Sequence, residues 1–342
     1  MTLVTETPAP SSGPSAAPAQ ARPRRRGAPP WLVWVGYAAL AAQLVAFSLL
    51  SPVFPTASNA VTVLTQGAVL AIAGFGMAVV LITGGDDVLR GGIDLSTGAV
   101  VGLSGVVAAV LTAAGTSAVV ALPVALLVAL VVGAVNAAAV VLGVRPLLAT
   151  LASGAVASSV TLVLTQNVKV PVSGGVFGWL RDGSVVGLPA SVVVLAVVFA
   201  VTATAVGATR WGVRAYAAGQ NPVAAAVAGV PVQRYVATSY LVSALLAGLA
   251  GLLLTARLSA GVPGVGDQLL LDVILTASMS VVFSRRLVVT IPGTLVSALF
   301  VAALTNGFTL VNVGSQWVGA VKGVLILLVV AVAAVRERSV QR

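Results

Sequence analysis

The sequence predicts an all-α integral membrane protein with about ten transmembrane helices and both termini in the cytoplasm. Of its 342 residues, 59% are hydrophobic and only 8% are charged, and the mean hydropathy is +1.11. A soluble domain has about 25% charged residues. Apolar runs of about 18 residues or more recur along most of the chain, and each is long enough to span a bilayer as a helix. The short alternating pattern of a membrane barrel is missing, so helices must satisfy the backbone within lipid.

Ten apolar segments give the expected spans. They are predicted at roughly 31–50, 61–83, 97–114, 118–142, 146–164, 189–208, 235–256, 269–284, 291–309 and 317–335. The fifth and the eighth are bracketed by polar or Gly/Pro-containing sequence, so either is a candidate for a short or re-entrant helix. The spans define a transmembrane domain at 30–336, with a short cytoplasmic tail at 337–342.

The first 29 residues form a separate region. They are rich in Pro, Ala, Ser and Thr and end in a cluster of arginines, so they are predicted to be a disordered basic cytoplasmic tail. A cleaved signal peptide would have a short apolar stretch after its charges. The run from Trp31 has the length of a membrane span, which favours an uncleaved first helix.

The basic residues set the expected orientation. With the N-terminus inside, fourteen of the 18 Lys and Arg residues fall in cytoplasmic segments: Arg22, Arg24, Arg25, Arg26, Arg90, Arg145, Arg210, Arg214, Arg234, Arg285, Arg286, Arg336, Arg338 and Arg342. The outside segments hold only Lys169, Arg181 and Arg257, and Lys322 falls in the last span. Both ends are basic, so an even number of spans agrees best with the positive-inside rule.

Composition excludes several classes of function. The net charge of +10 is scattered between apolar spans rather than gathered on one face, so no nucleic-acid partner is expected. The chain has no His and no Cys, and we predict no catalytic residues, no metal site and no cofactor. Neither Lys169 nor Lys322 precedes a Ser or Thr, so there is no Walker A motif. If ATP drives this protein, another chain hydrolyses it.

The first motif is the stretch GGIDLSTG at 91–98, between two long apolar runs. Gly91 and Gly92 permit a tight backbone, and Asp94 or Ser96 can cap the helix that follows. A carboxylate at this place is costly unless it is paired, hydrogen-bonded or close to water. Taken singly, these residues fit an ordinary capped turn between two membrane helices equally well.

The second motif lies at 209–230, between the sixth and seventh predicted spans and on the cytoplasmic side. Asn221 can cap a short helix, Pro222 suits its first turn, and Gly229 suits its C-terminal stop. We therefore predict a short helix at 222–228 outside the membrane. The alternative is an amphipathic connector without a partner.

Together the two motifs resemble those of the ribose-type sugar-importer permeases, the membrane subunits of ATP-binding-cassette (ABC) importers. The resemblance runs from about 60 to 335 and includes the pieces 146–151, 305–307 and 317–323. It implies a multi-pass permease of the bacterial inner membrane that passes a ribose- or xylose-like monosaccharide by alternating access. The implied partners are an ABC ATPase subunit, a periplasmic or lipid-anchored solute-binding protein, a second permease chain and membrane lipid.

The resemblance also implies roles for particular residues. In such permeases a coupling loop docks into a groove of the ATPase, and the matching positions here are Gly219, Gln220, Asn221, Pro222, Ala225 and Gly229. The signature turn corresponds to Gly91, Gly92, Asp94 and Ser96. Independently of the resemblance, polar residues inside the spans are candidates for the substrate path: Gln66, Asn136, Thr150 and Asn306. Interhelical hydrogen bonding is the commoner role of such residues.

The chain departs from the family pattern in two places. Residues 84–90 are inserted before the signature turn, and they look like an imperfect copy of its start. The glycines that the family has at the positions of 280–287 are lost. We hypothesise that a second, non-identical permease retains them. The alternative is a homodimer in which other residues have rebuilt the local geometry.

Other functions stay open at this point. One is a permease of the same family for another small solute, such as an autoinducer-like sugar derivative or a nucleoside. Another is an ion-coupled secondary transporter, which would need ionisable residues near the midplane. Only Asp94, Asp272 and Lys322 come close, which disfavours it. A structural or assembly role would explain the helices but leave the coupling loop without a purpose.

Overall fold

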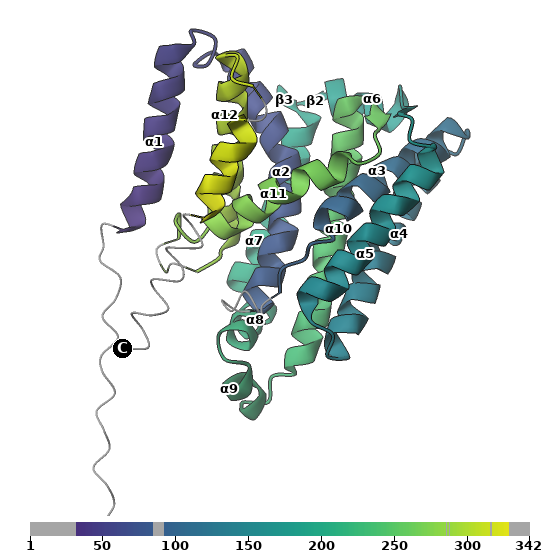
Figure 1. The fold of residues 1–342 in the computed structure, drawn as a ribbon, viewed down its shortest axis with the longest axis vertical. Coiled ribbons are helices and arrows are strands. Elements are labelled where there is room, and N and C mark those ends of the chain that lie inside the picture. Colours follow the sequence, from purple (N-terminus) through teal and green to yellow (C-terminus); the bar gives the residue numbers. More distant parts are fainter. Residues whose placement is uncertain (1–31, 85–91, 285, 287, 315–316, 328–342) are drawn as a thin grey trace, which may run out of the picture.

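The computed structural model describes residues 32–84, 92–284, 286, 288–314 and 317–327. Helices dominate this part of the chain (Figure 1). They are α1 (Leu32–Leu50), α2 (Ala57–Gly84), α3 (Thr97–Ala113), α4 (Ala118–Val141), α5 (Pro146–Thr165), α6 (Gly175–Asp182), α7 (Ala190–Ala208), α8 (Arg210–Gln220), α9 (Pro222–Val227), α10 (Val232–Leu258), α11 (Val265–Met279) and α12 (Ile291–Leu310), followed by an apolar helix at Trp317–Leu327. The strands, each of two residues, are β1 (Val170–Pro171), β2 (Ser184–Val185), β3 (Leu188–Pro189) and β4 (Ala260–Gly261). β1 pairs with β4 and β2 with β3, both antiparallel.

The all-α membrane fold agrees with the sequence prediction. By length and composition, six helices could each cross a membrane: α2, α4, α5, α7, α10 and α12. Each of the first nine predicted spans overlaps a helix, and the tenth overlaps the helix that ends at Leu327. The count of ten spans and the orientation of the termini stay predictions. The two predicted tails, 1–29 and 337–342, lie outside the described residues.

The two least regular predicted spans turn out differently. α5 has 20 residues and is about 30 Å long, which matches the hydrocarbon core of a bilayer. α11 has 15 residues and is about 22 Å long, which is too short to cross that core upright. Its predicted bounds, 269–284, were wrong. Gly264 at φ 72° starts the helix earlier, and successive turns at 280–284 end it sooner.

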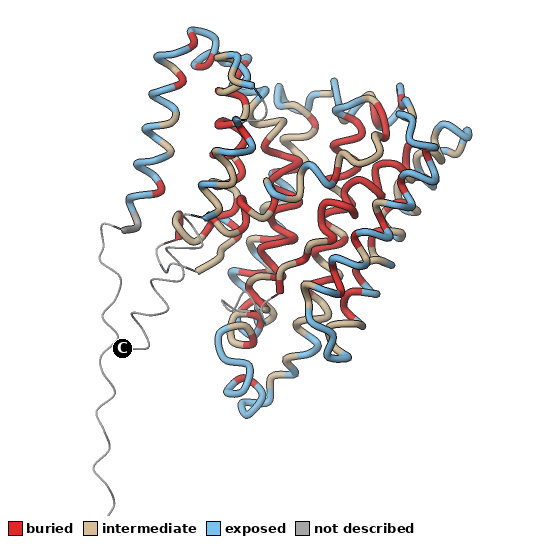
Figure 2. The backbone as a smooth tube through the Cα atoms, in the orientation of Figure 1, coloured by how far each residue is buried: buried red, intermediate tan, exposed pale blue. Residues whose placement is uncertain are grey.

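The core of the bundle is centred on α2, which packs against α10, α11 and α12. Every residue from Gly67 to Val80 is buried. Small residues let the helices approach closely, as where Gly133 of α4 lies against Ala244 of α10. α4 and α5 lie at the edge of the bundle, where much of their length is exposed (Figure 2). Most of their exposed large side chains are apolar, which is the pattern of helices that face lipid.

One end of the bundle is closed by a helix that the sequence reading missed. α6 lies at the end opposite α8 and α9 (Figure 1). Its Phe177 is buried with Val172 against Ala109 of α3, Ala125 of α4 and Leu252 of α10. The segment was predicted only as an outside loop, because eight residues are too few to show a clear period.

Candidate functional site

The signature turn lies between α2 and α3, and its Gly92 packs very closely against Val80 of α2. A Cβ placed on Gly92 would lie 2.8 Å from Cγ1 and 3.1 Å from the carbonyl oxygen of Val80. Only glycine fits such a position without moving the backbone. Gly91 and the inserted residues 85–90 lie outside the described part of the chain.

Asp94 is buried at the centre of a set of hydrogen bonds. Its Oδ1 accepts from the amide of Ser96 at 3.0 Å and from the Ser96 hydroxyl at 2.5 Å. Its Oδ2 accepts from the hydroxyl of Ser243, on α10, at 3.0 Å. Hydrogen bonds of this kind are what make a buried carboxylate tolerable. The turn is therefore fastened to the middle of α10.

The set extends from Asp94 to α4 and α5. Asn136 of α4 donates to the Ser96 hydroxyl at 2.8 Å and accepts from Ser153 of α5 at 2.5 Å. Thr150 of α5 accepts from the amide of Leu95 at 3.1 Å. We call these groups the polar cluster: Asp94, Ser96, Asn136, Thr150, Ser153 and Ser243. It joins the turn to three helices in the interior of the bundle.

The expected cap of α3 is absent. Ser96 occupies the N-cap position, but its side chain accepts no hydrogen bond from the first turn of the helix. The reason is geometric: the Ser96 hydroxyl is already engaged by Asp94 and Asn136. Asp94 bonds to the amide of Ser96, two residues on, so it closes the turn ahead of the helix instead of capping it.

The candidate path residues divide into two pairs. Asn136 and Thr150 join the polar cluster. Gln66 on α2 and Asn306 on α12 form none of its hydrogen bonds, and Oδ1 of Asn306 is buried without a partner among the described residues. The sequence reading missed Ser153 and Ser243. Ser153 follows Thr150 by three residues, so helical spacing could have revealed it, whereas nothing local marks Ser243.

No three His, Cys, Asp or Glu side chains are close enough to hold a metal ion in the parts of the chain that the structure describes. The buried polar groups of the site are hydroxyls, amides and one carboxylate. This set suits hydrogen bonding within the protein or to a neutral polar ligand.

The short helix predicted at 222–228 is present as α9. Oδ1 of Asn221 accepts from the amide of Ala224 at 2.9 Å, and Pro222 occupies the first helical turn. Gly229 has φ 79°, the left-handed conformation that ends a helix. The amides of Gly229 and Val230 donate to the carbonyls of Ala226 and Ala225, both at 2.9 Å.

α9 presents an apolar surface to its surroundings. Val223 and Val227 are 73% and 87% exposed, and they lie four residues apart on the same face. Ala225 is buried on the opposite side, against the rest of the protein. α9 therefore turns its small residue towards the protein and its larger apolar residues to the surface.

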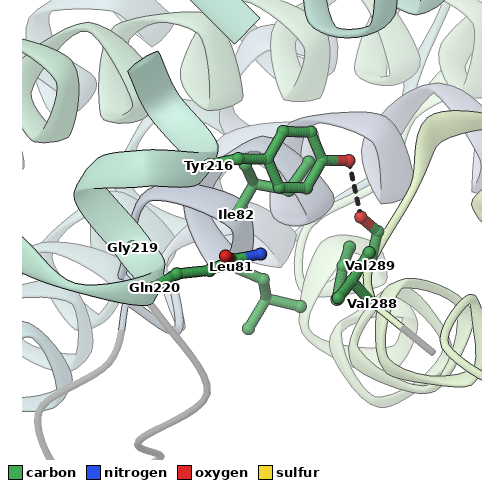
Figure 3. Close-up of a pocket in the computed structure, with 7 residues that line it drawn as sticks. All are labelled: Leu81, Ile82, Tyr216, Gly219, Gln220, Val288 and Val289. Carbon is green, nitrogen blue, oxygen red and sulfur yellow. Dashed lines mark hydrogen bonds between the residues drawn. The ribbon is translucent and has the colours of Figure 1, made fainter. Parts of the chain in front are cut away.

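α8, which precedes α9, is anchored on both sides. The indole of Trp211 donates to Thr238 of α10 at 3.2 Å. The hydroxyl of Tyr216 donates to the carbonyl of Val289, ahead of α12, at 2.7 Å (Figure 3). Burial raises the pKa of Tyr216 to about 12, so the hydroxyl stays protonated as a donor at any ordinary pH.

The Tyr216 contact borders a small hollow of about 30 Å³, with room for about one water molecule. Residues from three elements line it: Leu81, Ile82, Tyr216, Gly219, Gln220, Val288 and Val289 (Figure 3). The end of α2, the end of α8 and the segment before α12 therefore meet beside the start of α9.

The segment that lost its glycines adopts a backbone that other residues tolerate. None of its described residues, 280–284 and 286, has a positive φ. The close approach in this region is between Ser280 and Gly293 of α12: a Cβ on Gly293 would lie 2.5 Å from the carbonyl oxygen of Ser280. The glycine that this region needs is therefore Gly293, which the chain keeps.

Comparisons with known proteins cover nearly the whole bundle. The family model described as branched-chain amino acid transport system / permease component matches residues 59–330. The chain is 34% identical over 299 residues to the ribose import permease protein RbsC of Escherichia coli, covering 86% of this chain and 91% of that protein. It is 33% identical over 293 residues to the RbsC of Bacillus subtilis, covering 84% and 88%.

A more distant relative has another sugar in its name. The chain is 29% identical over 301 residues to the D-allose transport system permease protein AlsC of Escherichia coli, covering 85% of this chain and 88% of that protein. No solved structure matches the fold.

Proposed function

The chain belongs to the branched-chain amino acid transport system / permease component family, and from this premise we propose that it is the permease subunit of an ABC importer for a monosaccharide. Similarity to a ribose import permease over 91% of that protein's length carries the proposal, because the match includes the whole bundle rather than one shared segment. The protein is a multi-pass protein of the bacterial inner membrane, and its cargo is a sugar of the ribose type.

ATP is hydrolysed on a separate subunit, which docks on α9. The chain has no Walker A lysine, and α9 offers the exposed pair Val223 and Val227 for a groove. A solute-binding protein docks at the opposite end, near α6 and the β2–β3 hairpin (Figure 1). This arrangement places the α9 end, and both termini of the chain, in the cytoplasm.

Movement of α9 reaches the interior through α10. Only residues 228–231 separate the two helices, and the N-terminal part of α10 contacts α8 through Thr238 and Trp211. Ser243, in the middle of α10, is bonded to Asp94. A displacement of α9 when the ATPases close therefore shifts the polar cluster, and with it α3, α4 and α5. Such a shift can open the bundle alternately to each side.

Two permease chains form the passage, and we propose that both are copies of this chain. The negative φ values of the described residues at 280–284 support this, because they need no glycine supplied by a different partner. A heterodimer remains the competing arrangement. Coexpression of two differently tagged copies with the ATPase and the binding protein decides between them: capture of one tag together with the other indicates a homodimer.

Uptake into proteoliposomes tests the function. The chain is reconstituted with its ATPase and solute-binding protein, and labelled ribose, xylose, galactose and allose are each supplied outside, with a labelled nucleoside and a labelled sugar derivative supplied separately for comparison. We expect uptake of at least one of the four sugars, dependent on internal ATP and unaffected when the proton and sodium gradients are clamped at zero. Uptake that follows an ion gradient without ATP would show a secondary transporter. Uptake of a nucleoside or sugar derivative but of none of the four sugars would keep the mechanism and change the cargo.

A further inference from the structure

α11 runs obliquely across the bundle rather than along it (Figure 1). Gly266, near its start, lies against Gly98 and Gly102 in the first turns of α3. The next residue, Asp267, accepts a hydrogen bond from Ser158 of α5 at 2.8 Å. Ser158 lies just past the middle of α5, a helix of 20 residues that matches the thickness of the hydrocarbon core. Asp267 is therefore near the centre of the membrane.

The first turn of α11 exposes polar side chains. Asp267 and Gln268 are exposed there, whereas Leu271, one turn further on, is the exposed apolar residue and Val273 and Leu275 on the inner side are buried. α4 shows what a lipid-facing helix of this protein looks like: its exposed residues at mid-depth are apolar, as with Leu127, 60% exposed. A carboxylate and an amide in contact with lipid tails would be strongly unfavourable. This edge must be in contact with water or with polar groups.

The other carboxylate of α11, Asp272, has a charged partner within the protein. Asp272 forms an ion pair with Lys322 of the 317–327 helix at 2.8 Å, and both side chains are largely buried, at 17% and 12% exposed. Asp267 forms no ion pair with any residue that the structure describes. Its charge is stabilised by Ser158 and by its place in the first turn of α11, where the helix dipole favours an anion. No described residue donates a hydrogen bond to its Oδ2, so this oxygen can accept one from a ligand.

We infer that the exposed edge formed by Ser158, Asp267 and Gln268 lines the water-filled passage and hydrogen-bonds the hydroxyl groups of the sugar as it crosses. A carboxylate accepts from sugar hydroxyls, and a primary amide both donates and accepts, so the pair suits a neutral polyhydroxylated solute. The inference rests on the proposed function and names the surface of this chain that touches the cargo.

Cysteine labelling tests the inference directly, because the chain has no cysteine of its own. Asp267→Cys and Gln268→Cys are assembled with the ATPase and binding protein in proteoliposomes and treated with a charged, membrane-impermeant methanethiosulfonate. Leu127→Cys is the control, since Leu127 is exposed near the middle of α4. Only a hydrated thiol ionises and reacts, so we expect modification at 267 and 268 to be at least about tenfold faster than at 127. Binding protein loaded with whichever of ribose, xylose, galactose and allose it binds should slow the reaction at 267.

Equal slow modification at 267 and 127 in every nucleotide state would show that the edge does not face water. Fast modification that the sugar never slows would show a water-lined edge without solute contact. Either result overturns the inference. Labelling is followed without transport, so these outcomes are independent of the uptake assay that tests the importer function itself.

A second variant avoids the loss of the side chain. Asp267→Asn keeps the size of the residue and one acceptor, and we expect the KM for sugar uptake to rise about tenfold while assembly and ATPase stimulation at saturation persist. Leu127→Met is the control, because Leu127 is exposed near the middle of α4 and lies outside both this edge and the proposed docking surfaces. An unchanged KM in Asp267→Asn would remove Asp267 from the solute path.

Discussion

Asp94 and Asp267 lie close to the same depth of the bundle, since Gly98 of α3, four residues after Asp94, packs on Gly266 of α11, next to Asp267. Their surroundings differ. Asp94 is buried and accepts from Ser96 and Ser243, so both of its oxygens are engaged. Asp267 is exposed and has Ser158 as its single donor among the described residues. Asp94 holds helices together within the protein. Asp267, with an oxygen at the surface that no described residue engages, is the carboxylate that we propose hydrogen-bonds the solute.

The largest effect is expected from removing Asp94. Asp94→Ala takes away the acceptor of three buried donors, the amide and hydroxyl of Ser96 and the hydroxyl of Ser243, so we expect the free energy of unfolding to fall by about 3–5 kcal/mol. Asp267→Ala should change it by less than about 0.5 kcal/mol. Denaturant titration in detergent measures both. Equal losses of stability in Asp94→Ala and Asp267→Ala would show that the two carboxylates do not differ in their structural role.

Asp94→Asn sharpens the first prediction. It keeps one oxygen for Ser96 but loses the acceptor for Ser243, so we expect about half of the stability loss of Asp94→Ala. Transport should survive in proportion to the folded fraction. If Asn abolished transport as completely as Ala in a well-assembled complex, the charge of Asp94 would be required for the transport cycle itself.

A third carboxylate, Asp272, extends the comparison. Lys322→Met leaves Asp272 largely buried without its partner, and we expect a loss of about 2–3 kcal/mol. The double variant Asp272→Asn with Lys322→Met should recover most of it, because no unpaired charge remains. A single variant as stable as the parent chain would show that Asp272 is hydrated and belongs with Asp267 as an open group.

Gly229 tests the other open surface, the exposed face of α9. A valine at φ 79° costs about 1–2 kcal/mol locally, so Gly229→Val should distort the end of α9 without unfolding the bundle. We expect normal expression and a loss of sugar-stimulated ATPase activity. Gly207→Val is the control, because Gly207 has open space around it and no positive φ. Full stimulation in Gly229→Val would argue against docking at α9.

The smallest effect is expected at Tyr216. Tyr216→Phe removes one hydrogen bond between α8 and Val289 and should cost about 0.5–1.5 kcal/mol. Burial raises the pKa of Tyr216 from 10 to about 12 in the folded protein. The folded state therefore holds this proton more tightly, and the contribution to stability is complete below pH 10 and is lost as the pH rises towards 12. Comparing the two chains from pH 7 to 11 checks this, and a difference that grows between pH 6 and 8 would contradict it.

The helices and α9 were predictable because their signals are local. Apolar length marks the spans, and Asn221, Pro222 and Gly229 mark the two ends of a short helix within nine residues. The signature turn was also visible, but what Asp94 does there was not. Its second oxygen bonds to Ser243, 149 positions along the chain, and no local pattern reveals a contact at that separation.

The exposed edge of α11 escaped the sequence reading for a different reason. The predicted span began at 269, so Asp267 and Gln268 were assigned to an outside loop, where polar residues are unremarkable. The structure starts the helix at Val265 and brings it against the beginning of α3, and from this contact we infer that both residues lie near the middle of the membrane. Depth is a property of the packing of α3 against α11, and hydropathy along one segment cannot report it.

The contact that fixes this depth has a genetic consequence. A Cβ on Gly266 would run into the carbonyl oxygen of Gly98 and would lie 2.7 Å from the amide of Gly102, both backbone atoms that cannot rotate away. Every amino acid that a single base change can substitute for glycine carries a Cβ, so only synonymous changes of this codon leave the contact intact. If Asp267 and Gln268 contact the sugar as we propose, substitutions at these two positions can change the specificity while Gly266 keeps the surface at the same depth.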